Sequence, residues 1–288
     1  MMRWLDADKV ASRLTEYYGL PLAGRAGQSA EGSPYVEVSP QGVHENDSYR
    51  VRIVIGWRSL RGVFIPGAFA SQMIADMGRA SHADKTVFAE LVSRIQEEKG
   101  IVDMQVNGVA VDPVNFDDWP ADWERLSLVM EKSPLAVNTE DRPETDDALF
   151  RWGGRFFAAI LALTPLEEIN ADEDVNPEGL PEGAKTRVEV NKYERNRFNR
   201  AACIEIHGDT CKACGFDFGR VYGDLGKGYI QVHHLTPVSE LGPDYKINPA
   251  HDLIPLCANC HAMVHKRVPP LDVHELIGVI ERELSPRS

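Results

Sequence analysis

The sequence contains no apolar run long enough to cross a bilayer, which takes about 20 residues in a helix. The first residues, Met1 to Asp6, also lack the apolar stretch of a secretory signal. These two absences lead us to expect a cytoplasmic protein with no membrane partner. Thiols stay reduced in the cytoplasm, so disulfide bonds are the less favoured role for the 5 cysteines.

Positive charge is scarce as well, because 31 Lys and Arg stand against 44 Asp and Glu, for a net charge of −13. This excess of acidic residues lies in one part of the chain. Residues 186–288 hold 13 basic and 13 acidic side chains, so the first 185 residues carry the whole surplus of negative charge. Affinity for DNA comes mostly from neutralising phosphates, so this first part is a poor general binder of DNA. Any contact with DNA there is expected to be local and selective.

The length of 288 residues and the 43% hydrophobic content are enough for two domains, each with its own core. Between them, residues 165–187 are rich in acidic residues, proline and glycine, which is typical of a flexible linker. We therefore predict an α+β protein with a mixed α/β N-terminal domain at residues 1–164 and a small C-terminal domain at residues 188–288.

Several elements of the N-terminal domain are indicated by periodicity. Apolar and polar residues alternate over 49–55, which predicts a half-buried strand. A helix is predicted to open at Pro66 and to carry apolar residues from Phe69 to Met77. A second amphipathic helix is predicted over residues 87–95. The Asn-Gly pair between the apolar segments of residues 101–111 favours a hairpin with a type I′ turn.

Arginines and aromatics are interleaved in one stretch of this domain, and they are candidates for gripping DNA: Arg50, Arg52, Trp57, Arg58 and Arg61. Such a set could hold backbone phosphates and stack on a base, as a reader of a modified or extruded nucleotide would need. An ordinary strand with a charged, exposed face explains the same pattern and is the favoured interpretation. Three further tryptophans are expected in the core: Trp119, Trp123 and Trp152.

Two Cys-x-x-Cys pairs mark the C-terminal domain, Cys211 with Cys214 and Cys257 with Cys260. Each two-residue gap lets one tight turn aim both sulfurs inward, so the four thiolates can bind one tetrahedral zinc ion. A pair of disulfides is the disfavoured alternative. Cys203 has no partner at ligand spacing and is expected to be a buried thiol.

Four histidines accompany these cysteines, although four thiolates already complete a structural zinc site. His261 and His265 are four residues apart, so on a helix that starts at the second cysteine pair both rings project from one face. His233 and His234 follow a short apolar run, residues 229–232, that predicts a strand, and neighbours on a strand point to opposite faces. One of them can therefore hold a metal while the other holds a water.

These motifs closely resemble the HNH (ββα-metal) endonucleases, in the zinc-stabilised form found among restriction and homing enzymes. The resemblance covers residues 188–284. Its matching segments are Cys-Lys-Ala-Cys-Gly at 211–215, Val-His-His-Leu-Thr-Pro at 232–237, and Asp-Leu-Ile-Pro-Leu-Cys-Ala-Asn-Cys-His-Ala-Met-Val-His at 252–265. It implies a small zinc-stabilised ββα-metal nuclease domain that hydrolyses phosphodiester bonds.

Roles for the histidines follow from similarity to the nuclease colicins, which share the histidines but lack the cysteines. The resemblance implies that His233, His261 and His265 bind a catalytic divalent cation and that His234 is the general base. Mg²⁺ or Mn²⁺ is expected there, with Ni²⁺ as a further candidate. Neutral imidazole suits proton abstraction at neutral pH, and a divalent cation suits the charge that gathers on a phosphate.

The sequence departs from the family pattern at one position. Asp252 stands where the family normally has an asparagine, whose side chain holds the loop that carries the general base. Aspartate can accept a hydrogen bond from the loop backbone or from His234, although it cannot donate one as an amide would. Asn248 is a less well placed alternative. Three arginines at the entry to the domain could contact phosphates, or form an ordinary solvated helix face: Arg195, Arg197 and Arg200.

Among similar enzymes, an unrelated domain ahead of such a module often senses DNA modification. By this analogy we expect a restriction enzyme for methylated or phosphorothioated double-stranded DNA, active in anti-phage defence. A homodimer would supply the second site that a double-strand break needs. Two alternatives stay open at this point: an anti-phage nuclease activated by a ligand or protein, and a non-catalytic, zinc-stabilised DNA-binding protein.

Overall fold

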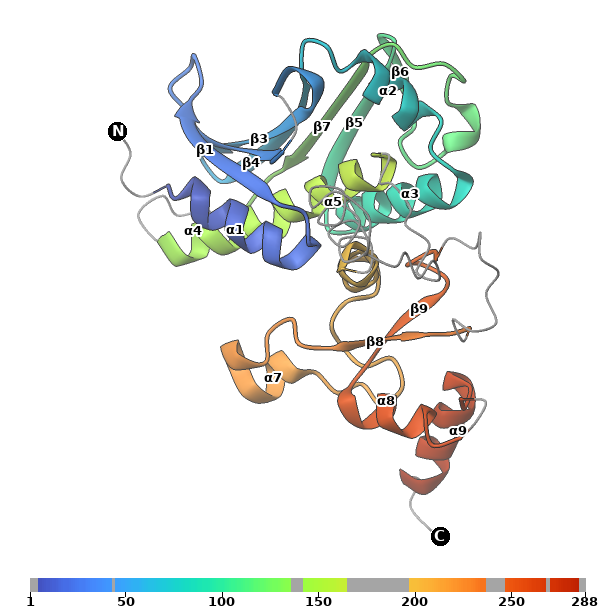
Figure 1. The fold of residues 1–288 in the computed structure, drawn as a ribbon. Coiled ribbons are helices and arrows are strands. Elements are labelled where there is room, and N and C mark those ends of the chain that lie inside the picture. The colour runs from blue at the N-terminus through green and yellow to red at the C-terminus, as the bar shows by residue number, and fades with distance from the viewer. Residues whose placement is uncertain are drawn as a thin grey trace, which may run out of the picture. The chain divides into compact units, whose positions relative to one another are not determined.

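The computed structural model describes residues 5–42, 45–135, 142–164, 197–236, 247–267 and 270–284. The chain divides into two units, one up to Phe198 and one from Asn199 onward. The predicted linker and the predicted start of the second domain at residue 188 lie outside the described residues, as does Arg195. Helices and strands are mixed, as the α+β prediction states (Figure 1).

The first unit is built on a seven-stranded sheet in which all neighbouring strands are antiparallel. In spatial order the strands are β1 (Leu22–Gln28), β2 (Pro34–Pro40), β3 (Tyr49–Gly56), β4 (Ser59–Pro66), β7 (Leu126–Lys132), β5 (Gly100–Val106) and β6 (Val109–Val111). β4 therefore pairs with β7 although residues 67–125 separate them in the chain.

Helices cover one face of this sheet (Figure 1). They are α1 (Ala7–Tyr18), α3 (His82–Glu97) and α5 (Gly154–Leu163), with α4 (Arg142–Ala148) and a π-helical turn (Leu149–Gly153) leading into α5. Every residue of α5 is buried, and its Phe157 ring lies 6.3 Å from that of Tyr49 on β3. A Cβ added at Gly62 of β4 would come within 2.6 Å of Phe156, so α5 packs closely on the middle of the sheet.

Most of the elements predicted for this unit are confirmed. β3 alternates between buried and half-buried residues, and α3 buries the predicted apolar stripe. The hairpin turns at Asn107 and Gly108, whose φ angles of 54° and 84° suit a type I′ turn. The three tryptophans expected in the core are buried.

The prediction that a helix begins at Pro66 is wrong about the first residue of that helix. Pro66 ends β4, and α2 begins only at Ser71 and runs to Gly78. The intervening loop stays bonded to the segment before β3, because the amides of Gly67 and Phe69 donate to the carbonyls of Ser48 and Asn46. Phe69 thus lies outside the helix and is 70% exposed.

The second unit has a β-β-α arrangement of β8 (Gln231–His234), β9 (Leu253–Leu256) and α8 (Ala258–Val264). β8 and β9 are antiparallel, and β8 includes the paired histidines, in keeping with the prediction that these neighbours lie on a strand. Residues 197–207 form a helix, and Gly208, whose φ is 81°, follows its last residue. α7 (Phe218–Tyr222) precedes β8, and α9 (Val273–Leu284) closes the unit.

The core of the second unit is small. Its buried residues come from helix 197–207, both cysteine pairs, the residue before β8, β9, α8 and α9. They are Ile204, Cys211, Ile230, Leu256, Cys257, Cys260, Val264, Val273 and Leu276. Cys203 is fully buried, and burial raises the pKa of its thiol to about 12, in keeping with the predicted buried thiol. No helix within the described residues is both long and apolar enough to traverse a membrane.

Candidate metal centres and active site

The first cysteine pair lies in a tight turn. The amide of Gly215 donates to the carbonyl of Cys211 at 2.9 Å, and the φ of 71° at Gly215 favours glycine there. The amide of Lys212 donates to the carbonyl of Pro255 in β9 at 3.0 Å. This bond holds the first pair beside the strand that leads into the second pair.

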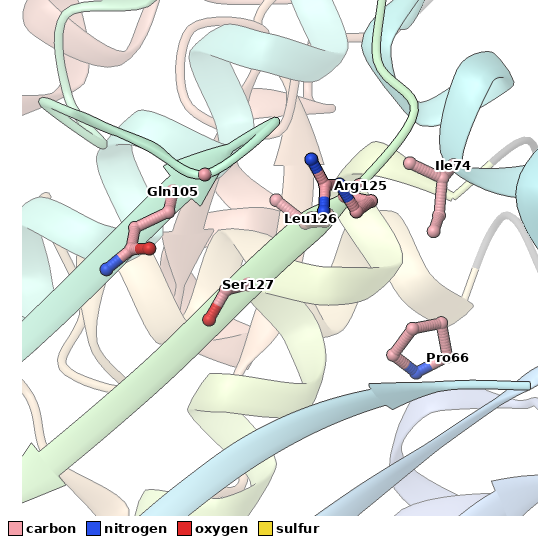
Figure 2. Close-up of a pocket in the computed structure, with 7 residues that line it drawn as sticks. Pro66, Ile74, Gln105, Arg125, Leu126 and Ser127 are labelled. Carbon is pink, nitrogen blue, oxygen red and sulfur yellow. The ribbon is translucent and has the colours of Figure 1, made fainter.

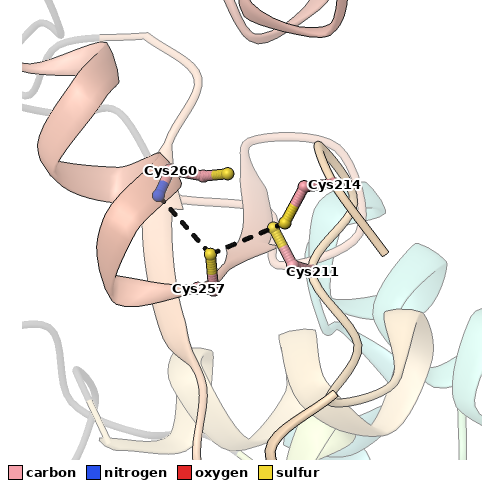
Figure 3. Close-up of side chains that lie close together, drawn as sticks. All are labelled: Cys211, Cys214, Cys257 and Cys260. Atoms are coloured by element: carbon pink, nitrogen blue, oxygen red, sulfur yellow. Dashed lines mark hydrogen bonds between the residues drawn. The ribbon is translucent and has the colours of Figure 1, made fainter. Parts of the chain in front are cut away.

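The second pair begins α8, because Cys257 is its N-cap residue and its Sγ accepts from the amide of Cys260 at 3.4 Å. The four Sγ atoms of the two pairs lie within 4.8 Å of one another (Figure 3). Cys214 Sγ and Cys257 Sγ are 3.7 Å apart. A tetrahedral zinc with Zn–S bonds of about 2.3 Å requires sulfurs about 3.8 Å apart.

All five cysteines are free thiols, so the disulfide alternative is excluded in this structure. Burial acts to raise the pKa of Cys211, but backbone hydrogen bonds from Cys257, Cys214 and Ala213 outweigh it and lower that pKa to about 7. Burial and the neighbouring sulfurs raise the pKa of Cys260. Four sulfurs this close cannot all ionise without a compensating cation, and a Cys₄ set with this spacing fits zinc.

Three histidines form a second cluster with one ligand nitrogen each, and these atoms also lie within 4.8 Å of one another. His233 comes from β8, His261 from α8, and His265 directly follows α8. Their ring centroids are separated by 5.4 Å, 5.0 Å and 4.8 Å. The spacing of four residues along the helix and the alternation along the strand thus bring the predicted set together.

Burial favours the neutral form of two of these histidines, His233 and His261. Burial, and then the charges of His265 and His261, lower the pKa of His233 to about 4. Burial also lowers the pKa of His261. His233 is only 5% exposed, so at neutral pH it presents an unprotonated nitrogen that can bind a metal. The residues fit a divalent cation, because one nitrogen from each of three imidazoles converges on the same point and imidazole is a common metal ligand.

His234 follows His233 on β8, so its side chain is directed to the other face of the strand. It is half-buried, and burial lowers its pKa, while the charge of Asp252 acts in the opposite direction. A neutral imidazole beside a carboxylate can accept a proton and be stabilised afterwards as imidazolium. The site therefore contains a group with the properties of a general base.

Asp252 holds the turn that precedes β9. Its Oδ2 accepts from the amide of Asn248 at 2.7 Å, and its own amide donates to the Asn248 carbonyl at 2.8 Å. Its carbonyl accepts from the amide of Leu235 at 2.8 Å, directly after His234. Asn248 belongs to the same turn, where its Oδ1 accepts from the amide of Ala250 at 2.9 Å. An aspartate thus bonds the loop backbone as an acceptor, which needs no amide donor.

His207 was missed by the sequence reasoning. It is the last residue of helix 197–207, and its Nε2 lies 3.0 Å from the carbonyl oxygen of Ala250, so the ring donates to the turn held by Asp252. The partners are 43 residues apart in the chain. No local motif signals such a contact.

Residues 211–267 match the sequence model of the HNH endonuclease family. This segment is an HNH endonuclease domain. The match begins at the first cysteine of the zinc set and includes both clusters, which confirms the resemblance over this range.

One curated relative is similar to part of the chain. The chain is 33% identical over 89 residues to the type IV methyl-directed restriction enzyme EcoKMcrA of Escherichia coli (strain K12). The similarity covers 30% of this chain and 30% of that enzyme, so it spans less than a third of either protein. No significant match to a solved structure is found.

The arginines considered for DNA contact have varied surroundings. Arg50 pairs with Glu45, and Arg52 pairs with the buried Glu37 at 2.6 Å. Arg52 also lies 4.3 Å above the Tyr35 ring. Both are thus engaged within the first unit, which agrees with an ordinary charged face.

The other candidates in the first unit are exposed to solvent. Trp57 is 90% exposed at the turn between β3 and β4, with Arg58 5.9 Å from its ring, and Arg61 is exposed on β4. Near the HNH domain, Arg200 donates to the carbonyl of Ile230 at 2.9 Å, just before β8. Arg197 is exposed.

Proposed function

We propose that this chain is a DNA endonuclease whose HNH domain hydrolyses phosphodiester bonds at the histidine cluster. The observation that carries the proposal is the convergence of three histidine ligand atoms within 4.8 Å, on the strand and helix that also present His234. The match of residues 211–267 to HNH endonucleases supports the same reaction.

In this proposal His233, His261 and His265 hold a divalent cation, Mg²⁺, Mn²⁺ or Ni²⁺, which would neutralise charge on the scissile phosphate and the leaving oxygen. His234 takes the proton from the attacking water. Asp252 keeps the adjoining turn in place and stabilises the imidazolium that forms. The four cysteines hold structural zinc, and because Cys257 begins α8, the zinc site fixes the helix that carries His261 and His265.

The substrate class is proposed to be modified double-stranded DNA, methylated or phosphorothioated, with the first unit as its reader. The similar Escherichia coli protein is named a methyl-directed restriction enzyme, which supports this class. The acidity of the first 185 residues supports recognition of a local feature rather than of the phosphate backbone in general. Two copies acting together would cut both strands.

A plasmid cleavage assay tests this proposal. Matched plasmids carrying no modification, 5-methylcytosine, 5-hydroxymethylcytosine or phosphorothioate are incubated with the purified chain and Mg²⁺ or Mn²⁺. His234→Ala serves as the inactive variant, and His274→Ala, which changes an exposed histidine on α9, serves as the matched control. Cleavage of one modified plasmid alone is expected. Equal cleavage of all plasmids would refute the dependence on modification while keeping the nuclease.

A second candidate keeps the nuclease but makes the first unit a sensor of a small molecule or protein. The acidity of the first 185 residues favours it, since that surface repels DNA. Cleavage of unmodified DNA that starts only after an activator is added would establish this candidate. A chain without metal-dependent nicking on any substrate, with or without cell extract, would be the non-catalytic DNA-binding protein.

A further inference from the structure

The first unit contains a pocket that opens where β4 and β7 separate. The two strands pair only from Leu60 with Lys132 to Val63 with Val129. Beyond that point β4 continues to Pro66 along β3, and β7 begins at Leu126 along β5. The pairing of β4 with β7 thus ends at Val63, before Pro66, the last residue of β4. The pocket lies at this gap in the sheet, and Ile74 of α2, Gly108 of the β5–β6 turn and Arg125 before β7 also line it.

The pocket has a volume of about 360 Å³, near the lower end of the roughly 300–1,000 Å³ typical of ligand sites. Its walls are mostly apolar, with Pro66 and Ile74 on one side and Leu126 on the other (Figure 2). Gly108 of the β5–β6 turn also lines it. A flat ring with apolar faces fits between such walls.

Three polar residues line the pocket as well, and Ser127 projects to the opposite face of β7 from its neighbour Leu126. Gln105 of β5 and Ser127 of β7 are direct cross-strand partners, so they project together from the face of the sheet opposite α5 (Figure 2). Arg125 immediately precedes β7. None of the three makes a side-chain hydrogen bond or ion pair with another part of the chain that the structure describes.

Arg125 projects from a main chain held on both sides. Its amide donates to Asn107 Oδ1 at 3.0 Å, and its carbonyl accepts from the Asn107 amide at 2.8 Å. The Asn107 amide group also donates to the carbonyl of Asp122 at 2.9 Å. The β5–β6 turn therefore fixes the position of a guanidinium that has no carboxylate partner among the lining residues.

We propose that this pocket binds a single nucleotide, with its base between the apolar walls. Gln105 and Ser127 bond the polar edge of the base, because an amide supplies both a donor and an acceptor. Arg125 pairs with the attached phosphate. It is the one charged lining group, and it is positive in a part of the chain that carries a large negative surplus. The pocket thus offers the local, selective contact that an acidic reader of DNA requires.

Such a nucleotide has two sources. A base inside a duplex cannot enter a pocket without leaving the stack, so a DNA-derived nucleotide would be extruded. A free nucleotide would instead act as an activator. The DNA source is the one we assign, and this choice rests on the proposed function of the first unit as a reader of modified DNA.

The experiment measures binding without cleavage, so it does not depend on the nuclease. The full chain carrying His234→Ala, kept without divalent cations other than its bound zinc, is titrated with short duplexes that contain one modified or unmodified target cytosine. 2-Aminopurine next to the target reports extrusion by its fluorescence. A parallel titration uses free mononucleotides.

Gln105→Leu removes the polar edge contacts at similar volume, Ser127→Ala removes one hydroxyl, and Arg125→Ala removes the phosphate contact. Matched controls are Gln96→Ala on α3 and Arg25→Ala on β1, which change exposed residues outside the pocket. Thermal melting identifies any variant that is unfolded, and the serine variant keeps the test valid if the leucine variant fails to fold.

The expected result is a fluorescence rise with one modified duplex, and binding weakened roughly 5- to 150-fold by Gln105→Leu or Arg125→Ala but not by the controls. Unchanged binding in all three pocket variants would overturn the proposal, as would an equal loss in Arg25→Ala. Tighter binding of free nucleotides than of any duplex, lost in the same variants, would overturn the DNA source. Absence of all binding would refute the site, even where cleavage in the plasmid assay succeeds.

Discussion

Replacement of Cys257 by alanine is predicted to unfold the second unit and leave the first intact. Cys257 is buried, its Sγ lies 3.7 Å from that of Cys214, and it begins α8. Three of the nine residues in the buried cluster of this unit are cysteines of the proposed zinc site, so its core is small without the metal. A structural zinc contributes about 10–16 kcal/mol, whereas a whole domain is stable by about 5–15 kcal/mol. Loss of the metal therefore exceeds what this core can supply.

The assay combines zinc content with calorimetry and limited proteolysis. The parent chain is expected to hold one structural zinc and to show a separate unfolding transition for each unit. Cys257→Ala is expected to hold no structural zinc, to lose the second transition, and to be cut by protease within residues 199–288. A chelator should reproduce this pattern in the parent chain.

Cys203→Ala is the matched control, because Cys203 is a buried cysteine of the same unit outside the zinc set. Its sulfur is not among the four that lie within 4.8 Å of one another, so it lacks the neighbouring thiolates that a tetrahedral zinc ion requires. This variant should keep its zinc and lose only about 1 kcal/mol of stability. A zinc-free Cys257→Ala chain that retains a cooperative second transition would refute the reasoning, and so would loss of zinc in Cys203→Ala.

Substitutions at three further residues test the turn before β9 and the packing of the sheet. Asp252→Asn should keep the cleavage rate within about tenfold, since the side-chain oxygen of asparagine can still accept from the backbone amide of Asn248. Asp252→Ala leaves the Asn248 amide unpaired, so it should lower the stability of the second unit by about 1–3 kcal/mol and lower the cleavage rate further. His207→Phe should lower the cleavage rate while zinc content stays constant, because the bond to Ala250 is lost. Gly24→Ala should lower the melting temperature of the first unit by roughly 3–10 °C, since its Cβ would meet the α1 backbone at 2.0 Å.

Each of these has a clear contrary outcome. Equal cleavage rates in the two Asp252 variants would show that the turn does not need the acceptor. A His207→Phe chain with unchanged cleavage would show that the bond to Ala250 has no part in the reaction. An unchanged melting temperature in Gly24→Ala would show that α1 can move away from β1 at no cost.

The parts of the structure that were predictable are those set by local spacing. Two residues between cysteines specify a knuckle, and four residues between His261 and His265 specify one helix face. The alternation over 49–55 and the Asn-Gly turn depend on near neighbours in the same way. These short-range patterns were sufficient to assemble both clusters, although the start of α2 was misplaced because Pro66 serves equally well as the end of a strand.

The remaining features depend on contacts between distant segments. The sequence carries no signal that β4 pairs with β7, or that they part after Val63, so the pocket could not be predicted. Nor does it indicate that Glu37 and Glu45 pair with the arginines of β3, or that His207 meets Ala250. Long-range pairing is decided by how whole elements pack, and one side chain does not reveal it.

The central claim is that the histidine cluster of the HNH domain is a catalytic centre distinct from the cysteine site. Its most direct test is the rate of metal-dependent cleavage of end-labelled DNA by His234→Ala, compared with the parent and His274→Ala at equal zinc content and equal melting temperature. The account predicts a loss of about 10²–10⁴-fold in His234→Ala alone, the usual contribution of a general base. A His234→Ala chain that cleaves as fast as His274→Ala would contradict it.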